Sequence, residues 1–279
     1  MSINEIEDLR KRNEQMGSVV ENGNFHIDKN AIAKLPLAQY EGRIVVVTSL
    51  EEAKKAVKAL SREKILGFDT ETRPIFTRGE PYLVSLVQLC GSRAVYLFRL
   101  DYCGGVAPLI PLFENREIIK TGVAVRDDVR HLKQRAPFDD AGFVDSAVYS
   151  RRLQIENTGL RALFAYFFGK RISKNAQVSN WAALQLSEQQ IVYAATDAWT
   201  SRELFLKLQA LGVAPAKISQ GSLFDAPATE VDDIVEEQRP AGTKKRRRRG
   251  PRRRYLKALK AAEAAESQTV PENQELKQQ

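Results

Sequence analysis

The chain has 279 residues, of which 43% are hydrophobic and 28% are charged, as in an ordinary soluble globular protein. Its sequence contains no run of the ~20 apolar residues that a membrane-spanning helix needs, and its polar N-terminus lacks the apolar segment of a secretory signal. The two cysteines and two histidines exclude a disulfide scaffold and argue against a structural zinc site. We expect an intracellular protein without membrane contact, cytoplasmic, or nuclear if its source is eukaryotic.

The positive charge of the chain is concentrated in one short segment. The formal net charge is +8, and residues 244–254 contain nine Lys or Arg and no acid, so the rest of the sequence carries only −1. Such a segment stays extended unless it binds a polyanion. Its composition is typical of a segment that binds nucleic-acid phosphates, of a nuclear localisation signal and of a solvated tail. We predict nucleic-acid binding by its nine cations, Lys244, Lys245, Arg246, Arg247, Arg248, Arg249, Arg252, Arg253 and Arg254.

The first predicted elements follow a polar lead-in of about 40 residues, which carries one candidate helix over residues 4–16. Residues 43–48 (RIVVVT) are rich in β-branched side chains and predict a strand. Ser49 and Glu52 then have the spacing of a capping box, and apolar residues recur at helical spacing from Ala53 to Leu60. A strand and an amphipathic helix thus open the main domain.

Three further strands are predicted in close succession. Residues 65–70 (ILGFDT), 82–89 (YLVSLVQL) and 94–100 (AVYLFRL) are rich in apolar and β-branched side chains, and residues 90–93 (CGSR) supply a turn. Because their connections are short, we expect an antiparallel meander.

Helices and strands alternate in the next part of the sequence. Helices are predicted over 106–113, 127–135, 145–153, 158–168 and 187–211, and strands over 117–123 and 143–144. This order predicts an α/β domain over residues 41–212, in which helices flank a mixed sheet made of an antiparallel meander and parallel strands. Residues 1–40 are then a lead-in, residues 213–243 a linker, and residues 244–279 a basic, disordered tail.

Two acids stand at the end of the second predicted strand. Asp69 and Glu71 in GFDTET are two residues apart, so their side chains point to the same face of a strand. Neighbouring carboxylates repel each other unless a cation lies between them, and their oxygens suit Mg²⁺ or Mn²⁺. The alternative is a pair of solvated acids that begin a loop.

A third acid lies where a predicted strand passes into a helix. In TGVAVRDDVRHL, both Asp127 and Asp128 fall at the start of a helix, where the helix dipole alone favours an acid. Asp128 is the better candidate for a functional residue, because the apolar Leu132 follows it by four residues and shares its helical face.

The last predicted helix carries a tyrosine and a fourth acid. Tyr193 and Asp197 in IVYAATDAW are four residues apart and share one face of a helix. A carboxylate one turn from a phenol can bind a metal ion while the phenol holds a water beside it. The alternative is that Tyr193 packs in the core and Asp197 caps the helix or pairs with a base.

Together, the acids and the tyrosine follow the order D-x-E, D, Y-x-x-x-D, and here the sequence resembles the DEDD (DnaQ-like) family of 3′–5′ exonucleases. The resemblance covers about residues 43–208, and it is carried by GFDTET, SLVQLC, TGVAVRDDVRHL, VDSAVYSRRL, SNW at 179–181 and LSEQQIVYAATDAWTSRELF. The histidine subclass has a histidine five residues before the last Asp, and here that position is Val192. Tyr193 stands four residues before Asp197, so the tyrosine subclass fits, as in enzymes similar to RNase D and the Werner exonuclease.

The resemblance implies a ribonuclease H-like fold and a metal-dependent 3′–5′ exonuclease. Asp69, Glu71, Asp128 and Asp197 match the four metal-binding acids, and Tyr193 matches the tyrosine that orients the attacking water. Two divalent ions, Mg²⁺ or Mn²⁺, are then expected to clamp the scissile phosphate of DNA or RNA, with nucleoside 5′-monophosphates as products. A catalytically weak or inactive nucleic-acid-binding module of the same fold is the alternative.

Several other residues have weaker functional signals. Gln88 and Trp181 match recurrent family positions but are interpreted as structural, and His131 lies one turn after Asp128. Three loop cations that could reach substrate phosphates, or are simply solvated, are Arg73, Arg78 and Lys174.

Overall fold

The computed structural model describes residues 3–15, 18–21, 24–73 and 83–215, and the following description is confined to them. The linker beyond Pro215 and the basic segment at 244–254 lie outside these ranges, so the division into domain, linker and tail stays a prediction. None of the helices in the described ranges has the length and apolar character needed to cross a membrane.

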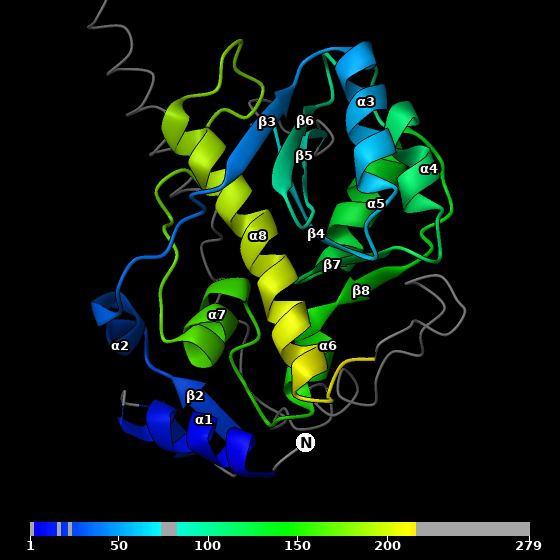
Figure 1. The fold of residues 1–279 in the computed structure, drawn as a ribbon. Coiled ribbons are helices and arrows are strands. Elements are labelled where there is room, and N and C mark those ends of the chain that lie inside the picture. Colours follow the sequence, from blue (N-terminus) through cyan, green and yellow to red (C-terminus); the bar gives the residue numbers. More distant parts are fainter. Residues whose placement is uncertain (1–2, 16–17, 22–23, 74–82, 216–279) are drawn as a thin grey trace, which may run out of the picture. The chain divides into compact units, whose positions relative to one another are not determined.

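A six-stranded mixed sheet forms the framework of the domain (Figure 1). Its strands follow the order β3-β6-β5-β4-β7-β8. β4, β5 and β6 form the expected antiparallel meander, and β3, β7 and β8 join it through parallel pairs. The predicted mixed sheet is therefore confirmed, with the bounds Arg43–Val47 for β3, Ile65–Thr72 for β4, Val84–Cys90 for β5, Ala94–Arg99 for β6, Ile119–Gly122 for β7 and Phe143–Asp145 for β8.

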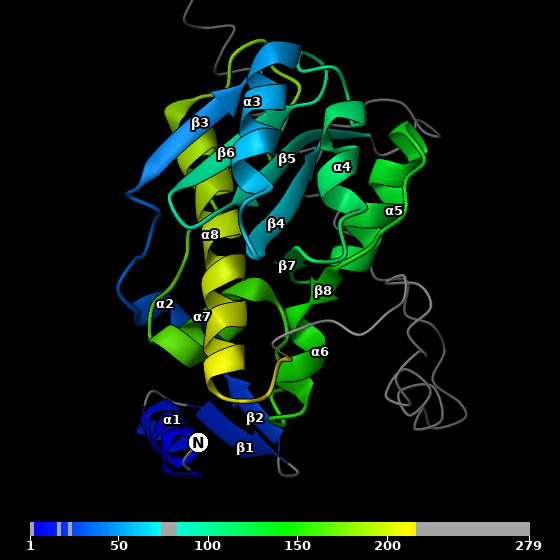
Figure 2. The same ribbon diagram turned by 45° about the vertical axis from the view of Figure 1, so that its right-hand side comes forward.

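Helices flank this sheet on both faces, as Figures 1 and 2 show. One face packs against α3 (Leu50–Leu60), the 3-10 helix η1 (Ala107–Leu109), α4 (Ile110–Phe113) and α5 (Val125–Arg135). The long α8 (Glu188–Ala210) crosses the other face, and α6 (Ser146–Arg151) and α7 (Leu160–Phe168) pack beside it. Because α8 contacts β3, β4, β5, β6 and β7, its side chains are held in fixed positions over the sheet.

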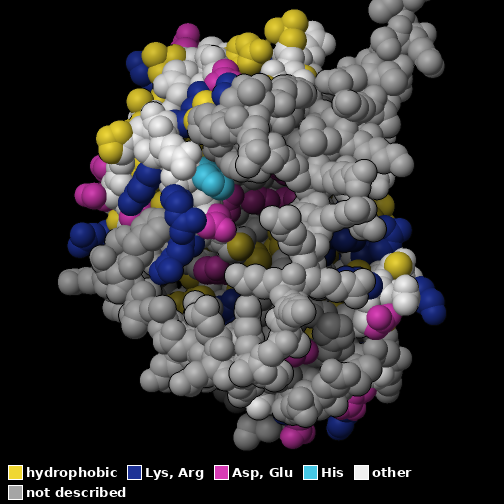
Figure 3. Space-filling view, turned by 180° about the vertical axis from the view of Figure 1, so that it is seen from behind, with side chains coloured by type: hydrophobic (Ala, Val, Ile, Leu, Met, Phe, Trp, Pro, Cys, Tyr) yellow, Lys and Arg dark blue, Asp and Glu magenta, His cyan; other side chains and the backbone are white. Residues whose placement is uncertain are grey.

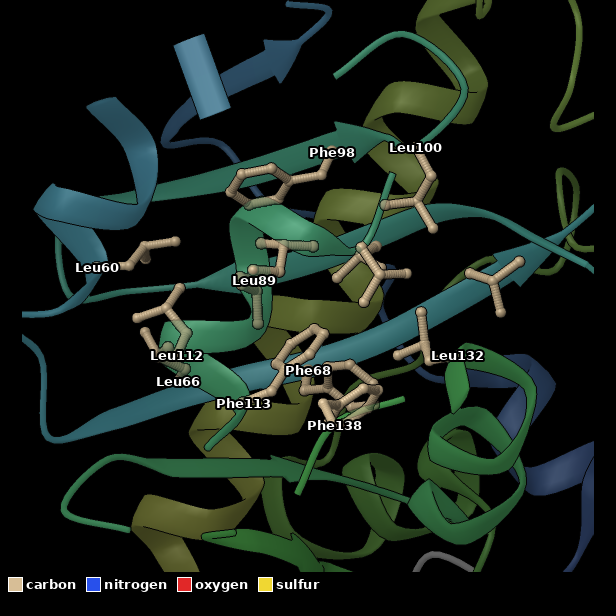
Figure 4. Packing of buried hydrophobic residues seen from close by; sticks show 14 of the residues in the cluster. Leu60, Leu66, Phe68, Leu89, Phe98, Leu100, Leu112, Phe113, Leu132 and Phe138 are labelled. Atoms are coloured by element: carbon tan, nitrogen blue, oxygen red, sulfur yellow. The ribbon is translucent and has the colours of Figure 1, made fainter. Parts of the chain in front are cut away.

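The largest apolar core lies between the sheet and the helices α3, α4 and α5 (Figure 4). Phe68 of β4 enters this core from the sheet, and Phe113 of α4 enters it from the helical side. The Phe68 ring lies 5.1 Å from that of Phe143, and the Phe113 ring lies 5.0 Å from that of Phe138. Phe68 and Phe113 are at most 1% exposed, so one face of β4 is anchored in a closely packed core.

Helix starts follow the signals in the sequence, with two differences. Ser49 caps α3 by accepting a hydrogen bond from the amide of Glu52. The Glu52 carboxylate, however, accepts from the amide of Thr48 at 2.8 Å, so the reciprocal half of the predicted capping box is replaced. The helix expected from residue 127 begins earlier, at Val125, because Ala124 adopts a left-handed conformation with a φ of 61° and lets the chain turn directly into α5.

The lead-in contains more structure than its sequence predicted. After α1 (Ile3–Gln15), a hairpin of β1 (Ser18–Glu21) and β2 (Asn24–Ile27) and the short α2 (Lys29–Lys34) precede the main sheet. Four-residue strands are too short to show a clear period in the sequence, and tertiary contacts hold this region in place. For example, the Asn13 side chain of α1 donates a hydrogen bond of 3.0 Å to the carbonyl of Tyr166 in α7.

Candidate active site

Asp69 and Glu71 face α8 at the end of β4, as the alternation of strand side chains predicts. Phe68 lies in the core on one face, so Gly67, Asp69 and Glu71 face the other. Gly67 is required because α8 crosses directly over it, and a Cβ at this position would lie 1.9 Å from the carbonyl oxygen of Ala198. This close approach brings the acids of β4 next to the middle of α8.

Tyr193 and Asp197 reach the same place from α8. The helix starts with a complete capping box at Ser187 and continues for 23 residues, so both side chains lie on one face. The Tyr193 hydroxyl donates a hydrogen bond to the Asp197 carboxylate, and Asp197 is only 6% exposed. The tyrosine ring lies 6.0 Å from the buried indole ring of Trp181, which restricts its orientation.

Asp128 approaches the site from the α5 side of the sheet. A Cβ on Gly122 would lie 2.6 Å from the carbonyl oxygen of Phe68, so glycine lets the end of β7 pass close to β4. In the first turn of α5, the Asp128 carboxylate accepts a hydrogen bond of 2.5 Å from the Thr70 hydroxyl. Thr70 points away from α8, and its contact with Asp128 therefore ties the first turn of α5 to the end of β4.

The neighbouring acid, Asp127, faces solvent. Its carboxylate pairs with Arg130 at 2.6 Å, and both side chains are more than half exposed. Leu132 is fully buried, so α5 turns Asp128, four residues earlier, toward the sheet. The structure thus places Asp128, and not Asp127, among the other acids.

The four carboxylates lie close enough to repel one another. Desolvation and the charge of Asp197 raise the pKa of Asp69 to about 8, and desolvation and the three other acids raise the pKa of Glu71. Desolvation and Asp69 also raise the pKa of Asp128, although the hydrogen bond from Thr70 opposes this shift. Burial raises the pKa of Asp197 to about 7. Without a cation, four ionised groups are therefore not stable together at neutral pH.

Tyr193 stays protonated in these surroundings. Burial and the carboxylates of Asp197, Glu71 and Asp69 raise the pKa of its phenol, since a phenolate would add another negative charge to the cluster. Its hydroxyl is consequently a hydrogen-bond donor and not a general base. It can orient a water or an oxygen of a ligand bound beside Asp197.

The chemistry of this donor set fits hard divalent cations. Carboxylate oxygens are the ligands that Mg²⁺ and Mn²⁺ prefer, and positive charge would relieve the repulsion among the four acids. Gln88, the cross-strand neighbour of Asp69, is fully buried, and its amide finds no hydrogen-bond partner among the described residues.

The carboxylates have to turn toward a metal ion in order to bind it. In the described part of the chain, no three His, Cys, Asp or Glu side chains are already grouped as metal ligands. Two of the four carboxylates already accept hydrogen bonds within the chain, Asp128 from Thr70 and Asp197 from Tyr193.

The weaker candidates of the sequence occupy different surroundings. Trp181 is buried beside Tyr193, His131 is partly buried on α5, and Lys174 is exposed in the loop after α7. Arg73 directly follows β4 and is partly buried, with its amide bonded to the carbonyl of Leu83 at 3.0 Å. Arg78 and the nine cations of 244–254 lie outside the described residues.

Two features of the site were missed at the level of sequence. Thr70 was overlooked because strand alternation turns it away from its two acidic neighbours. A pocket of about 310 Å³ was also missed, since its lining comes from distant segments: Leu37–Gln39, three residues after α7 (Ser173, Asn175 and Ala176), and α8 from Glu188 to Asp197. Tyr193 and Asp197 belong to this lining, so the pocket adjoins the acids.

Charges of both signs meet on one face of the molecule. Figure 3 shows Asp and Glu side chains gathered near the centre of this face, beside a histidine and several Lys and Arg side chains. Bordering cations of this kind attract a polyanion. The acids themselves repel a polyanion unless positive ions are bound among them.

Comparisons with known proteins cover most of this structure. A family model described as a 3′–5′ exonuclease matches residues 44–212. The sequence is 32% identical over 189 residues to the bifunctional 3′–5′ exonuclease/ATP-dependent helicase WRN of Mus musculus, a match that covers 64% of this chain and 13% of that protein. It is 30% identical over 237 residues to ribonuclease D of Gluconacetobacter diazotrophicus, which covers 81% of this chain and 58% of that protein.

A solved structure shows the same fold. The exonuclease domain of Nibbler from Aedes aegypti superposes with a TM-score of 0.58 and 22% sequence identity, over 62% of this chain and 91% of that domain. By contrast, the match spans less than two thirds of the length of the mouse and bacterial relatives. The similarity therefore concerns one domain of those proteins.

Proposed function

Because this chain belongs to the family of RNase D-like 3′–5′ exonucleases, we propose that it hydrolyses DNA or RNA from the 3′ end with two divalent ions, Mg²⁺ or Mn²⁺, and releases nucleoside 5′-monophosphates. One observation carries this proposal. Asp69, Glu71, Asp128 and Asp197 converge beside Tyr193 from three elements and from both faces of the sheet. Each acid alone has a structural explanation, whereas four buried acids with raised pKa values, three of them raised in part by the charges of the others, indicate a site for cations.

The residues of the chain have distinct roles in this proposal. When bound, divalent ions supply the positive charge that activates a water and stabilises the negative charge developing on the phosphate. The four carboxylates hold these ions, and Thr70 fixes the orientation of Asp128. The Tyr193 hydroxyl, which donates to Asp197 and stays protonated because its pKa is raised, accepts a hydrogen bond from the attacking water and so aligns it with the scissile phosphate.

The test compares two adjacent acids of α5. A 5′-labelled strand should be shortened from its 3′ end in Mg²⁺ or Mn²⁺ and should stay intact in EDTA. We expect Asp128→Asn to lower kcat by about 100-fold or more, because it removes a carboxylate from the cluster. Asp127→Asn should stay within about twofold of wild type, since its carboxylate forms only an exposed ion pair.

Two results would contradict the exonuclease proposal. One is equal loss or equal retention of activity in the two variants, and the other is the absence of metal-dependent shortening of every DNA and RNA strand tested. Stoichiometric binding of strands without any product would instead support the alternative, an inactive nucleic-acid-binding module of the same fold.

The basic segment 244–254 has a separate role in the proposal, argued from its sequence alone. The nine cations of this segment hold substrate phosphates and raise the concentration of strand near the site. Deletion of residues 240–279 should raise KM for long strands about tenfold and make it less dependent on salt. The kcat on short oligonucleotides should stay unchanged, and an unchanged KM for long strands would contradict substrate capture.

A further inference from the structure

A pocket adjoins the acids and shares Tyr193 and Asp197 with them. Its volume is about 310 Å³, and its three walls are the segment Leu37–Gln39, the loop residues Ser173, Asn175 and Ala176, and one face of α8 from the exposed Glu188 to the buried Asp197. Residues 37–39 precede the region 44–212 that matches the exonuclease family model. One wall of the pocket is thus a feature of this chain's own lead-in.

Hydrogen bonds within the chain hold the walls of the pocket in place. The amide of Arg171 donates to the carbonyl of Pro36 at 3.0 Å, and the carbonyl of Arg171 accepts from the amide of Ala38 at 2.8 Å. The amide of Tyr40 donates to the Thr196 hydroxyl at 3.0 Å, which fastens the lead-in to α8. The pocket is therefore formed before any ligand enters, which lowers the entropic cost of binding.

Amide side chains line the pocket in place of cations. Gln39, Asn175 and Gln189 each come from a different wall and are exposed, and Glu188 adds a carboxylate. Among the described lining residues none is Lys or Arg, so the pocket does not favour a phosphate. Amides and a carboxylate instead match the donors and acceptors on the edges of a nucleobase.

We propose that this pocket binds one nucleobase of the substrate strand, and that Gln39 and Gln189 favour a base with an exocyclic amino group. The inference rests on the proposed function, because Tyr193 and Asp197 line the pocket as well as the site. An amide binds adenine through its amino group and the adjacent ring nitrogen.

Removal of one amino group from the substrate tests this proposal. One set of strands carries adenine at the last, the second-last or the third-last position. A matched set carries the base purine at the same position, because purine is adenine without its amino group. For wild-type protein, kcat/KM should fall about tenfold with purine at one of these positions. The double variant Gln39→Ala/Gln189→Ala should cleave both strands equally, at the rate that wild type shows with purine.

Two controls separate base selection from general damage. Gln185→Ala changes an exposed glutamine outside the pocket and should keep the tenfold preference. Because Gln39 and Gln189 are exposed, the double variant should melt at the same temperature as wild type.

The outcomes for the pocket and for the exonuclease activity are distinguishable. Equal cleavage of adenine and purine strands by wild type overturns base selection, as does a preference that the double variant retains. The affinities of Asp128→Asn protein for the same strands, measured by fluorescence anisotropy with and without the two glutamine substitutions, repeat the comparison without turnover. A preference for adenine in binding supports the proposed role of the pocket. It does so even if no strand is shortened, because the absence of shortening would contradict only the proposed function.

Discussion

The two faces of β4 differ in their role: one packs into the apolar core, and the other carries two acids of the candidate site. On one face, Leu66 and Phe68 are buried in the apolar core formed with α3, α4 and α5. On the other face, Gly67 allows α8 to approach, and Asp69 and Glu71 carry charges that repel one another. The difference teaches that a strand firmly packed on one side can hold, on its other side, an arrangement that is unfavourable by itself.

Loss of the packed face should have the largest effect on stability. Phe68→Ala removes a ring that contacts Phe113 and Phe143 in the core, and we expect it to lower the free energy of unfolding by about 3–5 kcal/mol. Urea denaturation measures this loss. Tyr102→Ala is the control, because Tyr102 is 42% exposed, and a cost for Phe68→Ala no larger than that of the control would contradict the anchoring role.

The second largest effect should come from Gly67→Ala, which acts on the face toward α8. Its Cβ would meet the carbonyl oxygen of Ala198 at 1.9 Å, so the helix has to move away. We expect a loss of about 2–3 kcal/mol in stability and a fall in nuclease activity, since the acids of β4 and α8 separate. Both are measured on purified protein by denaturation and by strand shortening.

A matched glycine tests whether position, and not residue type, decides this result. Gly159 precedes α7 with an ordinary φ of −69°, and a Cβ there would meet nothing within 4 Å. Gly159 is the N-cap of α7, where alanine is poorer than glycine, so Gly159→Ala should cost no more than about 1 kcal/mol. Similar costs for the two substitutions would show that the close approach of α8 at Gly67 is unimportant.

Much of this contrast between the faces of β4 could be predicted from sequence, and the reasons are physical. The period of two in ILGFDTET places Asp69 and Glu71 on one face, and the buried Leu132 selects Asp128 over Asp127. Other features depend on where distant segments meet. Gly67 has no sequence signal for the crossing helix, and the pocket wall at residues 37–39 follows from pairing with residue 171.

The third prediction concerns stability against pH in the metal-free protein. The pKa of Asp69 is about 8 in the folded chain, above its ordinary value of 3.8, so folded protein retains a proton that unfolded protein has released. Wild-type stability must therefore fall as pH rises from about 4 to 8. Asp69→Asn has no such group, and it should be more stable than wild type by about 1 kcal/mol at pH 8 in EDTA while losing nuclease activity.

The pH dependence separates this electrostatic effect from better packing. The gain of Asp69→Asn should shrink as pH falls and vanish below about pH 3, where wild-type Asp69 is protonated in both states. Asp127→Asn, which changes an exposed acid, should show no gain above about 0.5 kcal/mol at any pH. Thermal unfolding across this pH range measures both, and a gain independent of pH would exclude repulsion among the carboxylates as its cause.

The last prediction concerns Thr70, the residue of β4 that contacts Asp128. Its side chain is 9% exposed and lies on the same face as Phe68, yet its hydroxyl donates to Asp128. Thr70→Val keeps a similar shape, so stability should change by only about 1 kcal/mol. The kcat should fall about tenfold, because the Asp128 carboxylate loses the group that orients it.

Rescue and pH dependence show whether Thr70 positions Asp128 or merely fills space. Thr70→Ser keeps the hydroxyl and should restore most of kcat, although it packs less well than valine. Since the hydrogen bond lowers the pKa of Asp128, its loss should shift the acidic limb of the kcat/KM profile to higher pH. If valine leaves kcat and this limb unchanged while serine lowers stability, Thr70 belongs to the packed face alone, and the two faces of β4 are independent at the strand end.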